Sequence, residues 1–420
     1  MRILFLTQII PYPPNAGPRV KTWHVLRYLH ERGHEVTLAS FVREEERPYL
    51  ARLDAVCTAV HTVPIKRSRV ADVGYWLKSH LSGRPFLVER DDLSGMRQLV
   101  LRLIAEQPFD VVHADQLTMA QFALDAKKLG GQKRPFILFD AHNATWSIWE
   151  RMRQNAPWFL KPVYQIEENR IQKYEGMLVE QFDHTLVVID PDRNLLLQGV
   201  APGKAAALAQ RISSVPIAVD VAVLQPVQRQ AGSRNILTLG TLSYPPNADG
   251  IRWFLQAIFP LIQQQVPDVT LTVIGKNPPA DFVQMAEQLK GAITVTGYVE
   301  DLTPYMEAAA LMVVPVRAGS GMRVRLLEAF ARAMPTVTTT IGLEGIIAEA
   351  DKEILLADEP QAFAAATVNL LKDVGLQEML AGNGRKLAEA RYDWRVVLKQ
   401  MDAVYNLAAA PAKNESKQYA

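Results

Sequence analysis

Short runs of β-branched and aromatic residues alternate along the chain with longer stretches in which apolar residues recur every three or four positions. The first pattern predicts buried strands, and the second predicts helices that cover a sheet. Strands joined by helices pair in parallel, because the helix carries the chain back to the starting edge of the sheet. We therefore expect an α/β fold with strands at residues 2–8, 35–41, 110–115, 135–143, 184–189, 235–240, 269–275, 292–297, 310–316 and 335–340.

A polar and flexible segment, PVQRQAGSRN at residues 226–235, interrupts this alternation. The 420 residues also exceed what one hydrophobic core usually supports. We expect two Rossmann-like, doubly wound parallel-sheet domains, at residues 1–225 and 226–392, facing each other across a ligand cleft. Helical spacing at 393–409 predicts a C-terminal helix that packs back toward the N-terminal domain, and residues 410–420 are expected to form a flexible tail.

Composition restricts the class of protein. Charged residues make up 21% and hydrophobic residues 49%, which is typical of a globular enzyme and not of a disordered chain, and no apolar run is long enough for a membrane span. The N-terminal run MRILFLTQII lacks a charged leader and a cleavage site, so we interpret it as a first strand and expect a cytoplasmic protein. Cys57 is the only cysteine, which excludes an internal disulfide and a cysteine-based zinc site.

A basic cluster surrounds Tyr75 and Trp76, with only Asp72 opposing it. This composition is compatible with peripheral binding to the inner face of a membrane, or with an anionic acceptor. The alternative is a solvated surface, since the cluster is small and lacks sustained amphipathic periodicity. Nucleic-acid binding has no comparable support. The basic residues of the cluster are Lys66, Arg67, Arg69, Lys78 and Arg84.

A second aromatic group lies between residues 146 and 159. We expect these side chains to pack in the core, with an acceptor-binding or membrane-facing surface as the alternative. The group consists of Trp146, Trp149, Trp158 and Phe159.

The segment at residues 311–346 has the pattern of a strand, a glycine loop, a helix, a strand and a second glycine turn. Gly319 and Gly321 allow backbone N–H groups to turn toward a ligand. The helix, whose N-terminus we place at Gly321–Met322, would present its positive end to the same point. The pattern therefore predicts an anion site.

Charged residues in this helix support the same interpretation. Arg323 and Arg325 lie near its first turn, where the helix dipole disfavours cations unless an anion offsets them. Glu328 is the only acid in an otherwise apolar or basic helix. The alternative is a structural strand-to-helix turn of the kind found in many parallel-sheet proteins, with Glu328 paired to Arg332 at i,i+4.

Several motifs occur in an order and at spacings that are specific only when taken together. They are PYPPNAGPR, LHERGHEVTLAS, DAHN, VPIAVDVAVLQP, LGTLSYPPNADGIRWF, VTGYVEDLTPYMEAA and GSGMRVRLLEAFARAMPTVTTTIGLEGI. Over nearly its whole length, the chain resembles the retaining nucleotide-sugar glycosyltransferases of the GT-B fold, specifically family four. The third and fourth motifs contain His142 and a segment similar to the family's hinge.

The resemblance implies a donor site in the C-terminal domain. Glu328 matches the second acid of the family's paired-glutamate motif and would accept hydrogen bonds from ribose hydroxyls. The edge that holds the nucleobase through backbone groups matches Gly297, Tyr298 and Val299. The loop around the diphosphate matches Gly319, Ser320, Gly321 and Met322.

The resemblance also implies two contributions from the N-terminal domain. His142 matches a histidine near the donor sugar, where a neutral imidazole can hydrogen-bond a hydroxyl. Judged on the residue alone, a strand-end histidine tied to local backbone is the alternative. Gly17 corresponds to the glycine loop that faces the diphosphate and the acceptor.

The chain departs from the family pattern at two places. The first acid of the glutamate pair should lie at Ser320, and serine supplies no charge. The family's Arg and Lys after the first strand of the C-terminal domain are also missing, since that region offers Thr241 and Asn247. Arg323 and Arg325 are the candidates to replace the lost positive charge, because guanidinium groups suit phosphate oxygens.

The triplet Asp190-Pro191-Asp192 matches the Asp-x-Asp metal motif of another glycosyltransferase fold. A helix start explains it better, with Asp190 as N-cap and Pro191 at the first helical position. No other His and carboxylate cluster has convincing metal spacing. We therefore expect donor binding without a metal ion or another cofactor.

The expected activity is retaining transfer of a hexose-type sugar from a nucleoside-diphosphate sugar to the hydroxyl of a glycan, lipid-linked or other acceptor, in polysaccharide, glycolipid or other glycoconjugate synthesis. The catalytic candidates are His142, Arg323 and Arg325, the last two stabilising the leaving diphosphate. The alternative is an inactive nucleotide-sugar binding protein of the same fold, suggested by Ser320. A dinucleotide-dependent oxidoreductase is disfavoured, because no first strand is followed by Gly-x-Gly-x-x-Gly.

Overall fold

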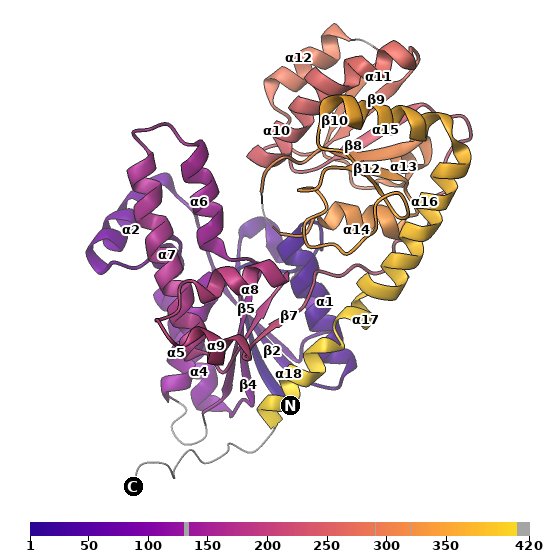
Figure 1. Cartoon of the computed structure of the whole chain (residues 1–420). Coiled ribbons are helices and arrows are strands. Elements are labelled where there is room, and N and C mark those ends of the chain that lie inside the picture. The colour runs from indigo at the N-terminus through magenta and orange to yellow at the C-terminus, as the bar shows by residue number, and fades with distance from the viewer. Residues whose placement is uncertain (130–133, 290, 320, 410–420) are drawn as a thin grey trace. The chain divides into compact units, whose positions relative to one another are not determined.

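The computed structural model describes residues 1–129, 134–289, 291–319 and 321–409 (Figure 1). The chain divides into two compact units, which we call unit 1 (Met1–Pro216 with Val397–Ala420) and unit 2 (Ile217–Val396). The breaks fall at Pro216 and Val396, whereas the sequence analysis places them at residues 225 and 392. The tail expected at 410–420 lies outside the described residues.

Unit 1 is built on a parallel sheet. Within the described residues, this sheet has seven strands in the order β3-β2-β1-β4-β5-β6-β7. Successive strands are added to one side as far as β3 and to the other side from β4 onward, so β1 and β4 form a topological switch point. The strands are β1 Arg2–Thr7, β2 Glu35–Val42, β3 Ala59–Pro64, β4 Val111–Asp115, β5 Phe136–Ala141, β6 His184–Val187 and β7 Ile212–Ser214.

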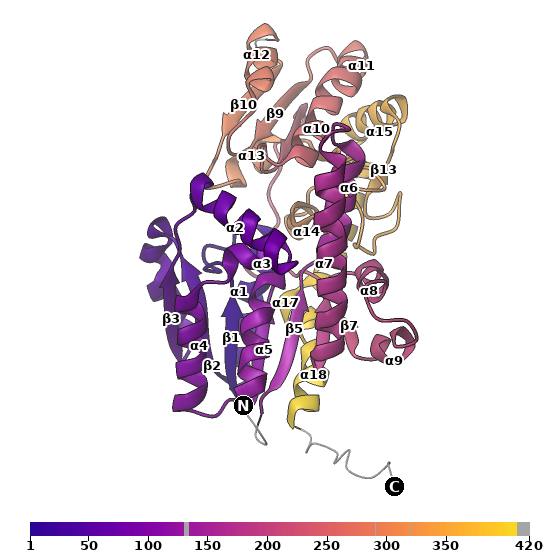
Figure 2. The ribbon, with the colours of Figure 1, turned by 90° about the vertical axis from the view of Figure 1, so that its left-hand side faces the viewer.

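Helices cover both faces of this sheet. The side chains of β1 point alternately to the two faces and are buried on both. Leu4 and Leu6 belong to a core formed with α4, α5 and α7, and Figure 2 shows α4 and α5 side by side. On the other face, Phe5 lies 4.3 Å from the ring of His113, which in turn lies 6.4 Å from the ring of Tyr405 in α18. The helices of unit 1 are α1 Gly17–Glu31, η1 Glu44–Ala55, α2 Arg69–Ser82, α3 Phe86–Asp91, α4 Ser94–Glu106, η2 Leu117–Met119, α5 Ala120–Leu129, α6 Thr145–Asn155, α7 Lys161–Gln181, α8 Asp190–Leu197, α9 Ala205–Ala209 and α18 Gln400–Ala409.

The C-terminal helix α18 packs on unit 1 through polar contacts as well. Tyr28 in α1 donates its hydroxyl to Asp402 at 2.9 Å, and Arg32 pairs with the same carboxylate. The His113 Nδ1 atom lies 2.8 Å from the Tyr405 hydroxyl. The last described helix is therefore part of the first unit's core.

Unit 2 repeats the architecture. Its parallel sheet has six strands within the described residues, in the order β10-β9-β8-β11-β12-β13, so the switch point lies between β8 and β11. The strands are β8 Asn235–Leu239, β9 Thr270–Ile274, β10 Ile293–Gly297, β11 Leu311–Val314, β12 Thr336–Thr338 and β13 Leu355–Leu356. The helices are α10 Pro245–Trp253, η4 Phe254–Ile258, α11 Phe259–Gln265, α12 Ala280–Gln288, α13 Thr303–Ala308, α14 Val324–Ala331, α15 Pro360–Lys372, α16 Val374–Leu387, η5 Ala388–Tyr392 and α17 Trp394–Val397.

The predicted strands are confirmed, and three short or edge strands were missed. β3 is half-buried, and β7 and β13 have three and two residues, so their hydrophobic signals are weak. The triplet at 190–192 begins helix α8, as predicted, but the N-cap is Ile189 and Asp190 is the first helical residue. Among the described residues, no helix combines the length and apolar character that crossing a membrane requires.

A buried acid connects the two helices of the α6–α7 hairpin. The Glu175 carboxylate of α7 accepts hydrogen bonds from the backbone N–H groups of Thr145, at 2.7 Å, and Trp146, at 3.2 Å. Burial raises the pKa of Glu175 from 4.5 to about 8, although these two N–H groups act in the opposite direction.

We expect Glu175 to make unit 1 less stable as pH rises. The folded state holds a proton that the unfolded state releases, so the stabilisation is complete below about pH 4.5 and is lost as pH rises through about 8. One such proton changes the free energy of unfolding by up to about 1.4 kcal/mol per pH unit. Urea unfolding between pH 5 and 8 should show this slope in the wild type and a flatter profile for Glu175→Gln.

The matched control is Glu180→Gln on the same helix. Lys204 lowers the pKa of Glu180, so the stability that this contact contributes is present above about pH 4.5 and is lost only in acid. Glu180→Gln should therefore lower the free energy of unfolding by a constant amount between pH 5 and 8 and leave the slope unchanged. Equal slopes for the wild type and Glu175→Gln would show that Glu175 is ionised throughout.

Candidate functional site

Each unit has a switch point where loops diverge beyond the carboxyl ends of two central strands, and ligands of doubly wound sheets bind at such points. In unit 1 these strands are β1 and β4, and in unit 2 they are β8 and β11. Polar side chains gather at both places.

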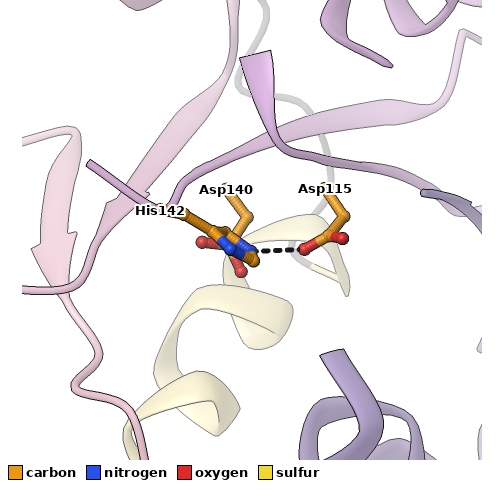
Figure 3. Close-up of side chains that lie close together, drawn as sticks. All are labelled: Asp115, Asp140 and His142. Carbon is orange, nitrogen blue, oxygen red and sulfur yellow. Dashed lines mark hydrogen bonds and ion pairs between the residues drawn. The ribbon is translucent and has the colours of Figure 1, made fainter. Parts of the chain in front are cut away.

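In unit 1, Asp115 at the end of β4 holds His142, which follows β5. The His142 Nε2 atom lies 2.6 Å from Asp115 Oδ1 (Figure 3). Asp115 Oδ2 accepts hydrogen bonds from the hydroxyls of Thr7, at 2.7 Å, and Thr22, at 2.9 Å. Three contacts thus fix the carboxylate, and the carboxylate fixes the imidazole.

This contact determines what His142 offers a ligand. Because Nε2–H donates to a carboxylate, Nδ1 of the neutral ring is a hydrogen-bond acceptor. The side chain is 10% exposed, so it is enclosed but reachable. The alternative of a histidine tied to local backbone is wrong, because its partner lies on another strand.

A buried ion pair lies beside this histidine. Lys21 Nζ in α1 pairs with Asp140 Oδ1 in β5, and both side chains are almost fully buried. His113 Nε2 lies 3.4 Å from the other oxygen of Asp140. Burial raises the pKa of Asp140, but the Lys21 charge and the contact with His113 outweigh that effect and hold the pKa well below its usual value. Burial and the Asp140 charge raise the pKa of Tyr405 well above its usual value.

Asp115, Asp140 and His142 are also close enough to hold a metal ion. Within the described residues, each offers a ligand atom, and these atoms lie within 4.8 Å of one another (Figure 3). A cation here would have to compete with the Lys21 ammonium group for Asp140 and displace the hydrogen bonds that already fill Asp115. The donor set therefore suits a hydrogen-bonding ligand better than a metal ion.

Apart from His142, sequence reasoning missed this cluster. Asp115 and Asp140 are acids at or near the ends of buried strands, and that position was the available signal. Lys21 and its hydroxyl neighbour Thr22 lie one turn into α1, which begins at the predicted residue Gly17.

In unit 2, the glycine loop follows β11. Gly319 and Gly321 have φ angles of 111° and 82°, which favour glycine. Helix α14 begins at Val324 with Arg323 as N-cap, so the predicted helix start at Gly321–Met322 is too early. The cause is a turn closed by Arg323, whose Nη1 donates to the Gly321 carbonyl at 2.7 Å.

The other two predicted loop residues are Met322 and Ser320. Met322 is buried, and its Sδ lies 3.4 Å from the backbone nitrogen of Ile217, so its side chain anchors the loop. Ser320 lies outside the described residues.

Arg325 extends from α14 to the end of β8. Its guanidinium donates to the Leu239 carbonyl and to the Asn247 side chain. It also lies directly against Gly240, where a Cβ atom would collide with it. Burial, together with the charge of Arg323, lowers the pKa of Arg325 to about 10, so the group remains a desolvated cation at neutral pH. The charge stands beside Thr241 and Asn247, where the family's Arg and Lys are missing.

Glu328 lies three residues further along α14. Among the described residues, no hydrogen bond or ion pair engages its carboxylate. The alternative pairing with Arg332 is wrong, since Arg332 Nη1 donates to the Thr303 hydroxyl at 3.2 Å. Burial raises the pKa of Glu328 against the opposing charges of Arg332 and Arg325. Glu328 is therefore a half-buried acceptor available to a ligand.

The predicted nucleobase edge follows β10. Gly297 ends that strand with a φ of 76°, and its carbonyl accepts a hydrogen bond from Gly275 at 2.8 Å. Tyr298 is 55% exposed and its ring lies 4.2 Å from Lys276 Nζ. The backbone groups of Tyr298 and Val299 make no hydrogen bond with other described residues, so they are available to a base.

Comparisons with known proteins bear on this arrangement. Residues 233–373, which include β8 to β13 and the glycine loop, match the family model described as glycosyl transferases group 1. A phosphatidyl-myo-inositol mannosyltransferase from Mycolicibacterium smegmatis is 27% identical over 94% of this chain and 92% of its own length. The chain carries a glycosyltransferase group 1 domain on a GT-B fold.

Solved structures agree with that fold. Sucrose-phosphate synthase from Thermosynechococcus elongatus matches with a TM-score of 0.72 at 17% identity, covering 98% of this chain and all of that one. Anabaena HepE in complex with UDP matches with a TM-score of 0.68 at 14% identity, covering 97% of this chain and all of that one. The predicted resemblance to a GT-B glycosyltransferase is therefore confirmed.

In this GT-B glycosyltransferase, we expect the Lys21–Asp140 pair to act as a unit. Removing one partner leaves a buried charge uncompensated, which typically costs about 3–5 kcal/mol of unfolding free energy. Lys21→Met and Asp140→Asn should each lower the free energy of unfolding by that amount. The double variant should lose clearly less than the sum, as measured by a double-mutant cycle in urea.

The exposed pair of Lys204 and Glu180, 2.6 Å apart, provides the control and should couple by less than about 1 kcal/mol. Additive losses at Lys21 and Asp140 would mean that His113 and His142 compensate Asp140 without the lysine.

Proposed function

We propose that this glycosyltransferase moves a hexose-type sugar from a nucleoside-diphosphate sugar to an acceptor hydroxyl with retention of anomeric configuration. The observation that carries the proposal is the pair formed at the switch point of unit 2 by a desolvated Arg325 and an uncommitted Glu328. One binds an anion and the other accepts hydroxyl hydrogen bonds. HepE, which has the same fold, has been solved with UDP and with UDP-glucose.

Arg325 and Arg323 would stabilise the departing diphosphate. Negative charge develops on the leaving oxygen, and fixed cations in a desolvated site interact with it more strongly than in water. The left-handed glycines 319 and 321 leave the backbone of the loop open to a close approach by phosphate. Arg325 would thus supply the positive charge that the family's missing Arg and Lys provide.

Glu328 would be the only acid that binds the ribose. The family uses two acids near the donor, and Ser320 stands at the position of the first. A carboxylate can accept from two adjacent hydroxyls, so one acid suffices for the ribose. Transfer by a site with a single acid is therefore chemically reasonable, which favours an active enzyme over an inactive nucleotide-sugar binding protein.

Retention would be achieved without a covalent intermediate, because the acids of unit 1 are already engaged. Asp115 is occupied by Thr7, Thr22 and His142, and Asp140 is occupied by its ammonium and imidazole neighbours. Neither carboxylate is free to act as a nucleophile, so we propose same-face attack with the leaving phosphate taking the acceptor proton. His142 would hold a sugar hydroxyl through Nδ1, oriented by Asp115.

We further propose that donor binding requires no metal ion, since Lys21 already supplies the cation of the acidic cluster. The acceptor would be a glycan, lipid-linked or other hydroxyl compound in glycoconjugate synthesis. The mannosyltransferase relative, whose name specifies a phosphatidyl-myo-inositol acceptor, supports the lipid-linked class. A cytoplasmic enzyme working at the inner face of a membrane fits such an acceptor.

Variants at Arg325 and Glu328 should separate phosphate binding from ribose binding. We expect Glu328→Ala to weaken the binding of both UDP and uridine by about tenfold to a hundredfold, because both ligands lose hydrogen bonds to a charged group. Arg325→Ala should weaken the binding of UDP by a similar factor and leave the affinity for uridine unchanged. Isothermal titration calorimetry with both ligands measures the difference.

Arg332→Ala is the control on the same helix, since its contact is to Thr303. Unchanged UDP affinity in Arg325→Ala, together with loss in Glu328→Ala, would refute the phosphate role of Arg325. No affinity of the wild type for any member of a nucleoside-diphosphate panel would refute the donor site.

The stereochemical proposal predicts that the anomeric configuration of the donor persists in the product. NMR of the product from a nucleoside-diphosphate-sugar panel should show it, with a rate unaffected by a chelator. Inversion would exclude the mechanism, and chelator-sensitive turnover would exclude metal independence. Nucleotide binding without transfer or hydrolysis across a broad acceptor panel would instead identify the inactive binding protein.

A further inference from the structure

Helix α2 in unit 1 is docked with its polar side inward. Four apolar residues recur at i, i+3, i+7 and i+11, which places them on one helical face. They are Val70, Val73, Leu77 and Leu81, with exposed fractions of 83%, 60%, 54% and 91%. The sequence interpretation that this region lacks amphipathic periodicity is therefore wrong.

The side of α2 that faces the protein is polar. Ser79 is the only buried residue of the helix. Its hydroxyl donates to the Arg84 carbonyl at 2.7 Å and accepts a hydrogen bond from Arg170 of α7 at 3.2 Å. Lys78 pairs with Glu89 of α3 at 2.7 Å. An amphipathic helix normally buries its apolar face, so this orientation leaves that face available for a partner.

Basic residues border the apolar face. Arg69 precedes Val70, and Lys66 lies in the segment leading into the helix; both are exposed, and within the described residues neither forms an ion pair. Lys78 is 53% exposed despite its pairing. Asp72, the acid in this stretch, lies on the opposite side by helical spacing. The border of the face therefore carries uncompensated positive charge.

A second apolar surface lies at the tip of the α6–α7 hairpin. Trp158 and Phe159 are 83% and 60% exposed, so their predicted place in the core is wrong. Val163 and Ile166 continue this exposed apolar stripe along α7. Trp146 and Trp149 do pack against the core, as predicted. Figures 1 and 2 show α2 beside α7, in agreement with the Ser79–Arg170 contact.

We propose that the outward face of α2, together with the α6–α7 tip, docks unit 1 onto an anionic lipid surface. An interfacial helix lies in the membrane plane with its apolar face in the acyl boundary, while basic side chains at its borders reach the headgroups. The four apolar residues match the first requirement, and Lys66 and Arg69 match the second. Exposed tryptophan and phenylalanine at the tip are suited to the same interface.

A lipid surface fits these features better than a protein partner. A protein-binding helix face would be expected to offer matched polar contacts around its rim, whereas this rim is basic and its acid faces away. The inference deepens the proposed membrane location but does not depend on sugar transfer. Vesicle binding can therefore succeed or fail independently of the donor site.

Vesicle flotation with the full chain tests this inference. The wild type should float with phosphatidylcholine vesicles that contain phosphatidylglycerol, and much less with phosphatidylcholine alone. Leu77→Glu combined with Leu81→Glu should reduce the bound fraction at least about tenfold, because two apolar anchors are lost. Lys66→Gln with Arg69→Gln should reduce binding only to the anionic vesicles and weaken its dependence on salt.

Val374→Glu is the matched control, since this residue is 59% exposed at the first position of α16 in unit 2. It should bind vesicles like the wild type. All variants should keep the wild-type melting temperature and UDP affinity, because the changed side chains are exposed and remote in sequence from the donor residues.

Vesicle binding that persists in the Leu77 and Leu81 variant would overturn the proposal. So would absence of binding to both vesicle types. In the second case, sedimentation showing concentration-dependent self-association that the same variant abolishes would assign the face to a second copy of this chain.

Discussion

Buried charge at the carboxyl ends of central strands is the constraint on which both units depend. Taking an ion out of water is costly unless another charge or several hydrogen bonds compensate it. Unit 1 meets this requirement internally, since Lys21 neutralises Asp140 and hydrogen bonds saturate Asp115. Unit 2 meets it only in part. Arg325 has a carbonyl and an amide oxygen as partners but no carboxylate, so its charge remains to be matched.

Under the proposed function, this difference suits the two units to different chemistry. A site whose charges are already balanced holds neutral groups by directed hydrogen bonds, as His142 can through Nδ1. A site with an unbalanced guanidinium and an unengaged carboxylate one turn away distinguishes an anionic part of a ligand from a hydroxylated part. Gly240 belongs to this arrangement because only a residue without Cβ leaves room for the guanidinium at the end of β8.

The sequence predicted the fold well because parallel strands buried on two faces appear as continuous apolar runs. It failed at β7 and β13, which are too short to form such runs. Arg325 and Glu328 could be proposed as site residues because they lie within one local motif. Asp115, Asp140 and Lys21 were not, because the contacts that define them join strands and helices separated by more than ninety residues in several cases. Periodicity reports burial, and it does not report which buried groups meet.

The orientation of α2 also could not be predicted from periodicity. Its apolar spacing is clear once the helix is known, yet spacing alone specifies an apolar face without specifying what covers it. The deciding contacts come from Ser79, a single small polar residue whose hydroxyl connects α2 to α7 and to its own following turn. Burying the opposite face instead would cost those hydrogen bonds and the Lys78–Glu89 pair. The fold thus holds the helix with its apolar side outward by polar contacts that a hydrophobicity pattern does not record.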